Sequence, residues 1–243
     1  MNLVIDIGNT AFKAAVFKSG EMISSKQWDE TDNSGLIVWL EAHTNIQKAI
    51  ISSVRTDDAG ISAVLKKLKI QQMILDEHTP LPLINSYKSA TTLGRDRIAA
   101  AVGANSKFPG QDLLIIDAGT AITIDFVSSD NEYLGGNISP GLSMRFRSLH
   151  EFTDNLPLLV PADIEDLLGN DTESAILAGV QHGIIFELDE YINRQKTRYP
   201  DLQVIITGGD AMFFDKKLKN HIFVDLNLNL YGLYRILDYN VGR

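Results

Sequence analysis

Two stretches, LVIDIGNTAFKAAVF at residues 3–17 and LLIIDAGTAITIDFV at residues 113–127, repeat one pattern. In each, an apolar run leads into Asp, any residue and Gly, a threonine follows closely, and a second apolar run resumes. The two aspartates, Asp6 and Asp117, lie 111 residues apart. Apolar runs on both sides of a short glycine-containing segment are typical of two strands joined by a tight turn. The repeat therefore indicates one supersecondary unit used twice.

The turn residues suit a bound phosphate. Glycine lets the backbone approach a ligand closely and present its N–H groups, and Thr10 and Thr120 can add hydroxyl donors. Asp6 and Asp117, each at the end of a strand and facing the same cleft, would hold a cation that neutralises phosphate charge. One copy alone is better explained as an ordinary hairpin turn, but two copies one domain length apart favour a shared ligand.

The composition excludes several classes of protein. A chain of 243 residues that is 44% hydrophobic can form one large domain or two smaller ones. The net charge of -9, without a Lys/Arg cluster, argues against nucleic-acid binding. There is no cysteine, which excludes disulfides, thiolate nucleophiles and cysteine-type zinc sites, and the five histidines lack metal-ligand spacing.

The start of the chain indicates a first strand rather than a signal peptide, because Asp6 interrupts its short apolar run. No apolar stretch approaches the roughly 20 residues of a membrane span. We therefore expect a cytoplasmic protein that has no membrane partner.

Strand and helix patterns alternate along the chain, which predicts the α/β class. A helix is expected over 95–108, a strand near Tyr133 and a long helix that begins near Asp171 or Thr172. Apolar residues spaced by four predict that one face of the long helix packs in the core: Ile176, Val180, Ile184, Leu188 and Ile192. Residues 152–168 hold two prolines and several acids and predict a surface connection. We expect two domains, 1–110 and 111–243.

A third element, TGGD at 207–210, follows an apolar strand and precedes a helix. With the two turns it resembles the actin, sugar kinase and Hsp70 superfamily, in which ATP lies between two related domains. The resemblance implies two ribonuclease H-like (actin-like) α/β domains with an interdomain cleft. Neither the dinucleotide-binding G-x-G-x-x-G after a strand nor the P-loop motif is present.

A short stretch, GRDR at 94–97, narrows the family. Taken alone, an aspartate between two arginines at a helix start fits a salt-bridged capping residue. The order DIGNT, GRDR, DAGTA, GGNISPG and TGG, however, resembles the type III pantothenate kinases over essentially the whole chain. That resemblance implies transfer of the γ-phosphoryl group of ATP to the primary hydroxyl of pantothenate, the first step towards coenzyme A.

The resemblance also assigns the substrate site. Asp96 would accept the hydroxyl proton, and Arg97 would bind the carboxylate or amide oxygens of pantothenate, because a guanidinium fork matches two oxygens. In the family the pantothenate pocket is completed across a homodimer interface, so a homodimer is implied. The substrate residues that match are Tyr87, Gly94, Arg95, Asp96, Arg97 and Thr172.

The nucleotide and its cations are assigned in the same way. Asp117 matches a family position for a monovalent cation, K⁺ or NH₄⁺; Mg²⁺ accompanies ATP, and Asp6 is a candidate ligand for it. Lys13 fits either a cation that faces phosphate or a solvated strand residue. The expected ATP-binding residues are Asp6, Ile7, Gly8, Asn9, Thr10, Ala11, Phe12, Lys13, Thr120, Gly208 and Gly209.

Two departures from the family pattern stand near the substrate site. Ser89-Ala90 replaces the common Asn-Pro and predicts a looser loop around Tyr87, and Arg95 stands where alanine is frequent.

Two other functions remain open: a kinase of another acceptor, such as a sugar or acetate, and a nucleotide-binding regulator without chemistry. Retention of Asp6, Asp96 and Asp117 together argues against the regulator.

Overall fold

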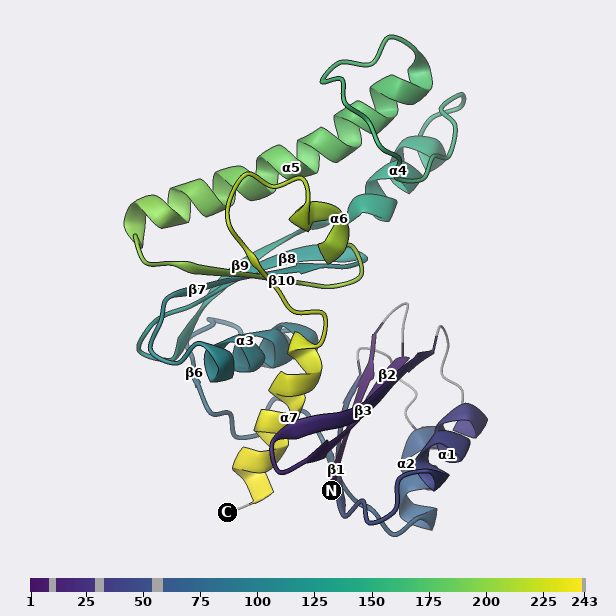
Figure 1. The fold of residues 1–243 in the computed structure, drawn as a ribbon, viewed down its shortest axis with the longest axis vertical. Helices are drawn as coiled ribbons and strands as arrows, with labels where there is room; N and C mark the ends of the chain where they lie inside the picture. The colour runs from purple at the N-terminus through teal and green to yellow at the C-terminus, as the bar shows by residue number, and fades with distance from the viewer. Residues whose placement is uncertain (9–11, 29–32, 54–58, 242–243) are drawn as a thin grey trace. The chain divides into compact units, whose positions relative to one another are not determined.

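The computed structural model describes residues 1–8, 12–28, 33–53 and 59–241. The chain forms two compact units, drawn in Figure 1. The first comprises Met1–Pro109, Asn131–Leu134 and Asn227–Arg243, and the second comprises Gly110–Asp130 and Gly135–Leu226.

The first unit contains a five-stranded sheet in the order β3-β2-β1-β4-β5. β1 and β2 form the antiparallel hairpin that the sequence predicts, and β4 lies parallel to β1 on its other side. The strands are β1 (Asn2–Ile7), β2 (Phe12–Lys18), β3 (Glu21–Trp28), β4 (Lys48–Ser53) and β5 (Gln71–Ile74).

Helices cover both faces of this sheet. On one face, α1 (Asn33–Glu41) and α2 (Ala59–Lys67) pack on apolar strand residues, including Leu3, Ile5 and Ile51. On the other lies α7 (Leu228–Val241), where the ring of Phe17 stacks on that of Tyr234 with 4.4 Å between centroids. Figure 1 shows α1 and α2 on one side of these strands and α7 on the other.

The C-terminal segment differs from the predicted domain division. The sequence places all of 111–243 in the second domain, whereas α7 packs against β1, β4 and α3 (Arg95–Lys107) of the first unit. Residues 131–134 also belong there, because β6 (Ile84–Asn85) pairs in parallel with the first residues of β9 (Glu132–Pro140). The short η1 (Ala90–Thr92) precedes α3.

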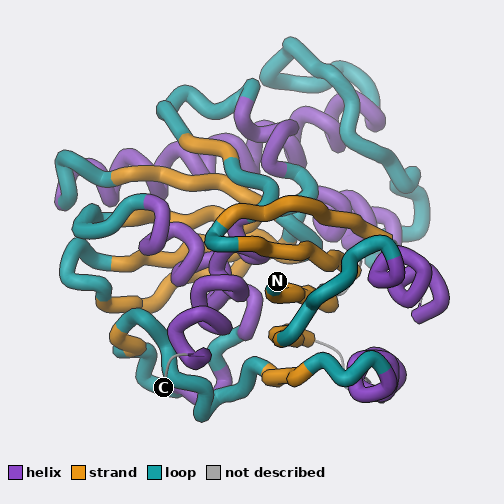
Figure 2. The backbone as a smooth tube through the Cα atoms, turned by 60° about the horizontal axis from the view of Figure 1, so that its bottom comes forward, coloured by secondary structure: helices purple, strands orange, loops and turns teal. Residues whose placement is uncertain are grey.

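The second sheet has the strand order β11-β10-β7-β8-β9-β6. β7 and β8 form the second predicted antiparallel hairpin, and β10 lies parallel to β7. Figure 2 shows the strands of the chain in orange and its helices in purple. α4 (Leu142–Glu151), α5 (Thr172–Arg198) and α6 (Ala211–Asp215) share one apolar core with these strands. The remaining strands are β7 (Leu113–Ala118), β8 (Ala121–Val127), β10 (Gln203–Thr207) and β11 (Phe223–Val224).

α5 begins with a capping box, since the Asp171 side chain accepts a hydrogen bond from the Ser174 N–H at 2.8 Å. Of the two caps that the sequence left open, Asp171 is therefore the cap and Thr172 is the first helical residue. The side chains spaced by four along the helix are buried in the core as predicted: Ile176, Val180, Ile184, Leu188 and Ile192. Among the described residues, no helix has the length and apolarity that crossing a membrane requires.

β9 is longer than the sequence predicts and continues through GGNISP to Pro140. Gly136 permits this, because a Cβ there would lie 2.1 Å from the Ile124 carbonyl oxygen of β8. Pro140, which has no N–H to donate, takes the last position of the strand. The strand therefore ends directly at the cap of α4.

Candidate active site

The first turn connects β1 to β2 beyond the Ile7–Phe12 pair. Asp6 is paired with Lys13 of β2 on one side and with Ser52 of β4 on the other. Paired residues on neighbouring strands present their side chains on the same face of the sheet, so Lys13 and Ser52 flank the Asp6 carboxylate. Gly8 lies at the described edge of the turn, and the predicted ATP-binding residues Asn9, Thr10 and Ala11 lie outside the described residues.

The second turn is one residue shorter than the first. Its last pair is Ala118 with Ile122, whereas the first turn closes with Ile7 and Phe12. The Gly119 N–H donates to the Ala121 carbonyl oxygen at 3.2 Å and closes the turn. Gly8 and Gly119 are 111 residues apart, whereas Phe12 and Ile122 are 110 residues apart, so the second copy has one residue fewer between its strands.

Asp117 lies between two threonines of neighbouring strands, Thr123 of β8 and Thr207 of β10. Gly208 follows with a φ of +95°, and a Cβ there would lie 2.4 Å from the Ala118 carbonyl oxygen and 2.6 Å from Asp117 Oδ1. Only glycine fits this position. The Asp117 carboxylate and the Ala118 carbonyl oxygen both come close to Gly208, and oxygen atoms of these two kinds are the ligands that hard cations prefer.

The TGGD segment, residues 207–210, lies at the C-terminal end of β7. The Asp210 N–H donates to the Ala118 carbonyl oxygen at 2.9 Å, so Gly208 and Gly209 lie beside the second turn. The structure thus brings Asp117, Thr120 and the glycine pair together within the second unit.

Asp210 was not singled out by the sequence analysis. Desolvation by burial raises the pKa of its half-buried carboxyl above the ordinary value. A raised pKa in the folded protein means that this carboxyl destabilises the fold once it ionises. The protonated carboxyl makes its full contribution to the free energy of unfolding below the ordinary pKa. That contribution is lost as the pH rises through the raised pKa of the folded protein.

Asp210→Asn should therefore raise the melting temperature at neutral pH, and the gain should shrink as the pH falls towards the ordinary aspartate range. Differential scanning fluorimetry of both proteins without nucleotide, from pH 7 down to about pH 4, near the ordinary aspartate pKa, measures this. A gain that stays constant with pH would show that the carboxyl charge is not its cause.

The GRDR stretch forms the start of α3, with Gly94 as its N-cap. The Asp96 carboxylate accepts a hydrogen bond from the Arg97 N–H at 2.9 Å, and a Cβ on Gly94 would lie 2.5 Å from Asp96 Oδ1. A helix N-terminus favours a negative charge. The guanidinium of Arg95 donates instead to the Ser53 carbonyl oxygen at 3.1 Å and ties the helix start to the end of β4.

Arg97 and Tyr87 lie together in the first unit. Arg97 is only 5% exposed, and its guanidinium carbon lies 5.6 Å from the centre of the Tyr87 ring. Tyr87 also contacts Tyr133 edge to face, and its N–H donates to Asn85 Oδ1 at 3.1 Å.

The loop between Tyr87 and α3 is held by its own hydrogen bonds. The Thr92 hydroxyl lies 2.9 Å from the Ser89 carbonyl oxygen and 2.8 Å from the Ser89 hydroxyl. The Ser89-Ala90 pair, predicted to loosen this loop, thus takes part in a closed turn at η1.

The structure places the predicted site residues in two groups. Tyr87, Gly94, Arg95, Asp96 and Arg97 lie in the first unit with the first turn, and Thr172 lies exposed at the start of α5 in the second unit with the second turn. Within the described ranges, no three His, Cys, Asp or Glu side chains gather as a metal site.

The comparison with known proteins agrees with the order of the motifs. A family model described as type III pantothenate kinase matches residues 2–194. A type III pantothenate kinase of Bacteroides fragilis is 49% identical over 246 residues, covering 100% of both chains.

The chain belongs to the type III pantothenate kinase family.

Solved structures support the fold of this family member. A Baf family protein from Campylobacter jejuni is 23% identical, covers 99% of this chain and 100% of its own, and has a TM-score of 0.62. A ROK family protein from Streptococcus pneumoniae is 12% identical, covers 100% and 99%, and has a TM-score of 0.52. The predicted α/β class with two related actin-like domains is confirmed.

Two residues that lie beside the predicted pantothenate kinase site are identified only by the strand pairing in the structure. Ser52 and Thr123 lie next to Asp6 and Asp117 because of the register of the sheets. The sequence carries no local signal for either residue, since each is brought to its aspartate by a different strand. Both side chains are buried.

Proposed function

We propose that this chain transfers the γ-phosphoryl group of ATP to the primary hydroxyl of pantothenate and forms 4′-phosphopantothenate, the first step of coenzyme A biosynthesis. The observation that carries the proposal is the start of α3, where Asp96, Arg97 and Tyr87 lie together in a chain that matches this family over its full length. We place the reaction in the cytoplasm, where ATP and pantothenate are present; cell fractionation followed by immunodetection tests that location.

Asp96 is the proposed base. The hydroxyl oxygen of pantothenate forms a bond to the γ-phosphorus, the bond from that phosphorus to the β–γ bridging oxygen breaks, and the hydroxyl proton passes to the Asp96 carboxylate. Such transfers need mainly alignment and charge stabilisation from the protein. The hydrogen bond from the Arg97 N–H fixes the carboxylate for this task.

Arg97, Tyr87, Gly94 and Thr172 are the proposed pantothenate ligands. The buried Arg97 guanidinium, held against the Tyr87 ring, supplies fork-shaped donors for a carboxylate or an amide oxygen. The Arg95 side chain donates a hydrogen bond to the Ser53 carbonyl oxygen, so we propose that Arg95 holds the start of α3 in place.

The two turns and the glycine pair are the proposed ATP site. Lys13, next to Asp6 across the hairpin, places a positive charge beside the first turn, which supports a phosphate contact. Thr120 and the N–H groups of the second turn, together with Gly208 and Gly209, serve the rest of the nucleotide.

Two cations are proposed. Mg²⁺ bound with ATP would screen the phosphate charge, and Asp6 is its proposed protein ligand. Asp117, which with the Ala118 carbonyl oxygen lies close to Gly208, is the proposed ligand of K⁺ or NH₄⁺. Replacement of potassium by sodium should therefore depress turnover, and Asp117→Asn should remove this dependence. Equal rates in both salts would contradict the role of Asp117.

The assay that tests the function measures ADP release from ATP, Mg²⁺ and K⁺ with pantothenate, a sugar or acetate as acceptor. Release with pantothenate alone supports the proposal. Release only with a sugar or acetate would assign another acceptor, and nucleotide binding without release in any arm would indicate a regulator.

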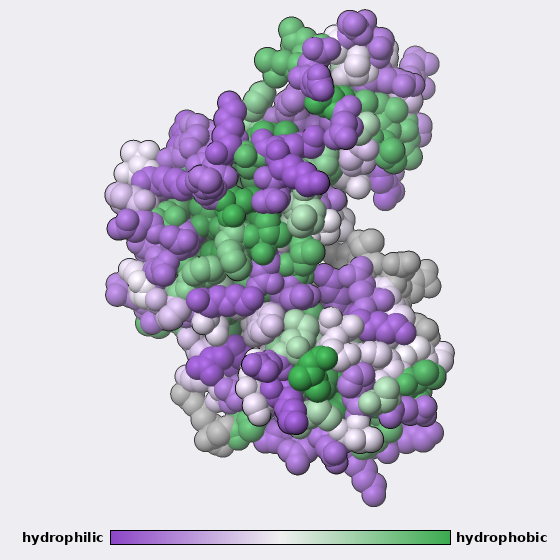
Figure 3. Space-filling view, in the orientation of Figure 1, coloured by the Kyte–Doolittle hydropathy of each residue, from purple (hydrophilic) through white to green (hydrophobic). Residues whose placement is uncertain are grey.

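We also propose a homodimer. Large apolar side chains are exposed in and between α4 and α5, and Figure 3 shows apolar surface in that part of the molecule. A concentration of exposed apolar side chains is typical of a protein interface. These residues are Met144, Phe152, Leu158, Val160, Leu167, Leu168 and Phe186.

Light scattering should give twice the mass of one chain, and Leu168→Glu, at a side chain that is 83% exposed, should shift the protein towards monomer. A wild-type protein that stays monomeric at high concentration would refute the homodimer.

A further inference from the structure

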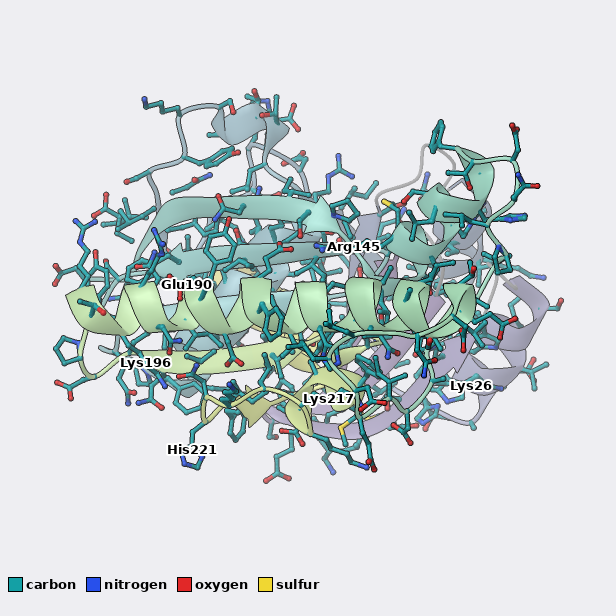
Figure 4. All side chains as sticks on the ribbon, turned by 90° about the horizontal axis from the view of Figure 1, so that it is seen from above. Lys26, Arg145, Glu190, Lys196, Lys217 and His221 are labelled. Carbon is teal, nitrogen blue, oxygen red and sulfur yellow. The ribbon has the colours of Figure 1, made fainter. Side chains whose placement is uncertain are left out.

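An ion pair joins α4 to α5 beside the second turn. Arg145 Nη2 lies 2.5 Å from Glu187 Oε2, and the Ser139 hydroxyl donates to Glu187 Oε1 at 2.7 Å. The Nε–H group of the same guanidinium donates to the Pro140 carbonyl oxygen at 2.9 Å. Both charged side chains are about three-quarters covered, at 23% and 25% exposed. Figure 4 labels Arg145 beside α5.

These bonds act on the last two residues of β9 and the N-cap of α4, residues 139–141, which we call the corner. Glu187 uses both of its oxygens, one for Ser139 and one for Arg145, and Arg145 in turn holds the carbonyl of Pro140. α5 therefore fixes the corner through a side-chain hydroxyl and a backbone carbonyl at once.

The corner lies directly against the second turn. The Gly141 N–H donates to the Thr120 carbonyl oxygen at 3.0 Å. A Cβ on Gly141 would lie 2.2 Å from the Gly119 carbonyl oxygen and 2.5 Å from that of Thr120. The two backbones are in contact with no side chain between them, so a displaced corner displaces the turn as well.

A neighbouring pair on the same helix shows what an ordinary surface ion pair looks like here. Arg147 and Glu151 of α4 lie 3.0 Å apart with side chains 67% and 52% exposed. Such i,i+4 pairs stabilise a helix only slightly and are screened by salt. The Arg145–Glu187 pair differs because it joins two helices and a strand end.

We propose that Arg145 and Glu187 are positioning residues for the second phosphate turn, so that their contacts with the corner set the affinity for the nucleotide. This role rests on the ATP site proposed above. Neither side chain needs to touch ATP; each acts through Pro140, Gly141 and the backbone of Thr120.

The test measures the affinity for a non-hydrolysable Mg–ATP analogue by calorimetry, which requires no acceptor and no turnover. Arg145→Ala and Glu187→Ala should each weaken binding on the order of tenfold, because small displacements of a binding group are costly. The double variant should be little weaker than either single one, since the two residues act as one unit. Arg145→Lys, which keeps the charge but lacks the fork, should restore part of the affinity.

Arg147→Ala is the matched control, since it removes an arginine and an ion pair from the same helix and should leave affinity unchanged. Melting temperatures are measured for every variant, and each titration is run well below them. Lowered melting temperatures with wild-type affinity would overturn the proposal and leave the pair a purely structural link. A wild-type protein that fails to bind the analogue would overturn it too.

The same measurements distinguish a failure of the proposed function from a failure of the proposed role of Arg145 and Glu187. If the wild-type protein binds the analogue but phosphorylates no pantothenate, the reaction is wrong, while the affinities of the variants still decide the role of the pair.

Discussion

Asp96→Asn should lower turnover with pantothenate by about 10²-fold or more, the usual contribution of a positioned acid or base. Asparagine keeps the size of the side chain, and its amide oxygen can still accept the hydrogen bond from the Arg97 N–H. The start of α3 should therefore keep its shape, while no group remains to take the hydroxyl proton. Steady-state ADP release at saturating ATP and pantothenate measures the effect.

Two further measurements make this result specific. The affinity for Mg–ATP should stay close to that of the wild type, because the phosphate turns are unchanged. Asp130→Asn is the matched control, since it removes one carboxylate charge from an exposed turn and should leave turnover unchanged. An Asp96→Asn protein with near-wild-type turnover would refute the assignment of the base.

Gly232→Ala should lower the free energy of unfolding by about 3 kcal/mol, as overpacking does at a tight contact. A Cβ at this position of α7 would lie 1.8 Å from the Ala99 carbonyl oxygen of α3. On the other helix, a Cβ on Gly103 would lie 2.3 Å from the Leu228 carbonyl oxygen. The two helices touch backbone to backbone, so an added methyl group must push them apart. Urea unfolding followed by circular dichroism measures the loss.

The same substitution at Gly179 of α5 is the control. A Cβ there meets no atom within 4 Å, so alanine should be neutral or stabilise the helix by up to about 1 kcal/mol. Because α3 carries Asp96 at its start, Gly232→Ala should also lower turnover. Equal stability of the Gly232 and Gly179 variants would show that the helices can move apart at little cost.

Local patterns predicted most of the elements. Both hairpins, α3 and the buried stripe of α5 follow from residue spacing within a single segment, since side-chain periodicity depends only on neighbours in the chain. Where the prediction was wrong, a distant partner decided the structure. The extension of β9 depends on the fit of Gly136 against β8, and the domain division fails at α7 because its apolar face packs on the first unit.

By itself, the sequence determined the two Asp-x-Gly turns, the GRDR helix start and the order of motifs that marks the family, because each is written in consecutive residues. Only the tertiary structure decided which side chains stand beside them: Ser52 next to Asp6, Thr123 and Thr207 next to Asp117, and the Arg145–Glu187 pair behind the second turn. Such neighbours come from strand register and from helices that meet across the core. They are set by the joint packing of segments far apart in the chain, which no local pattern records.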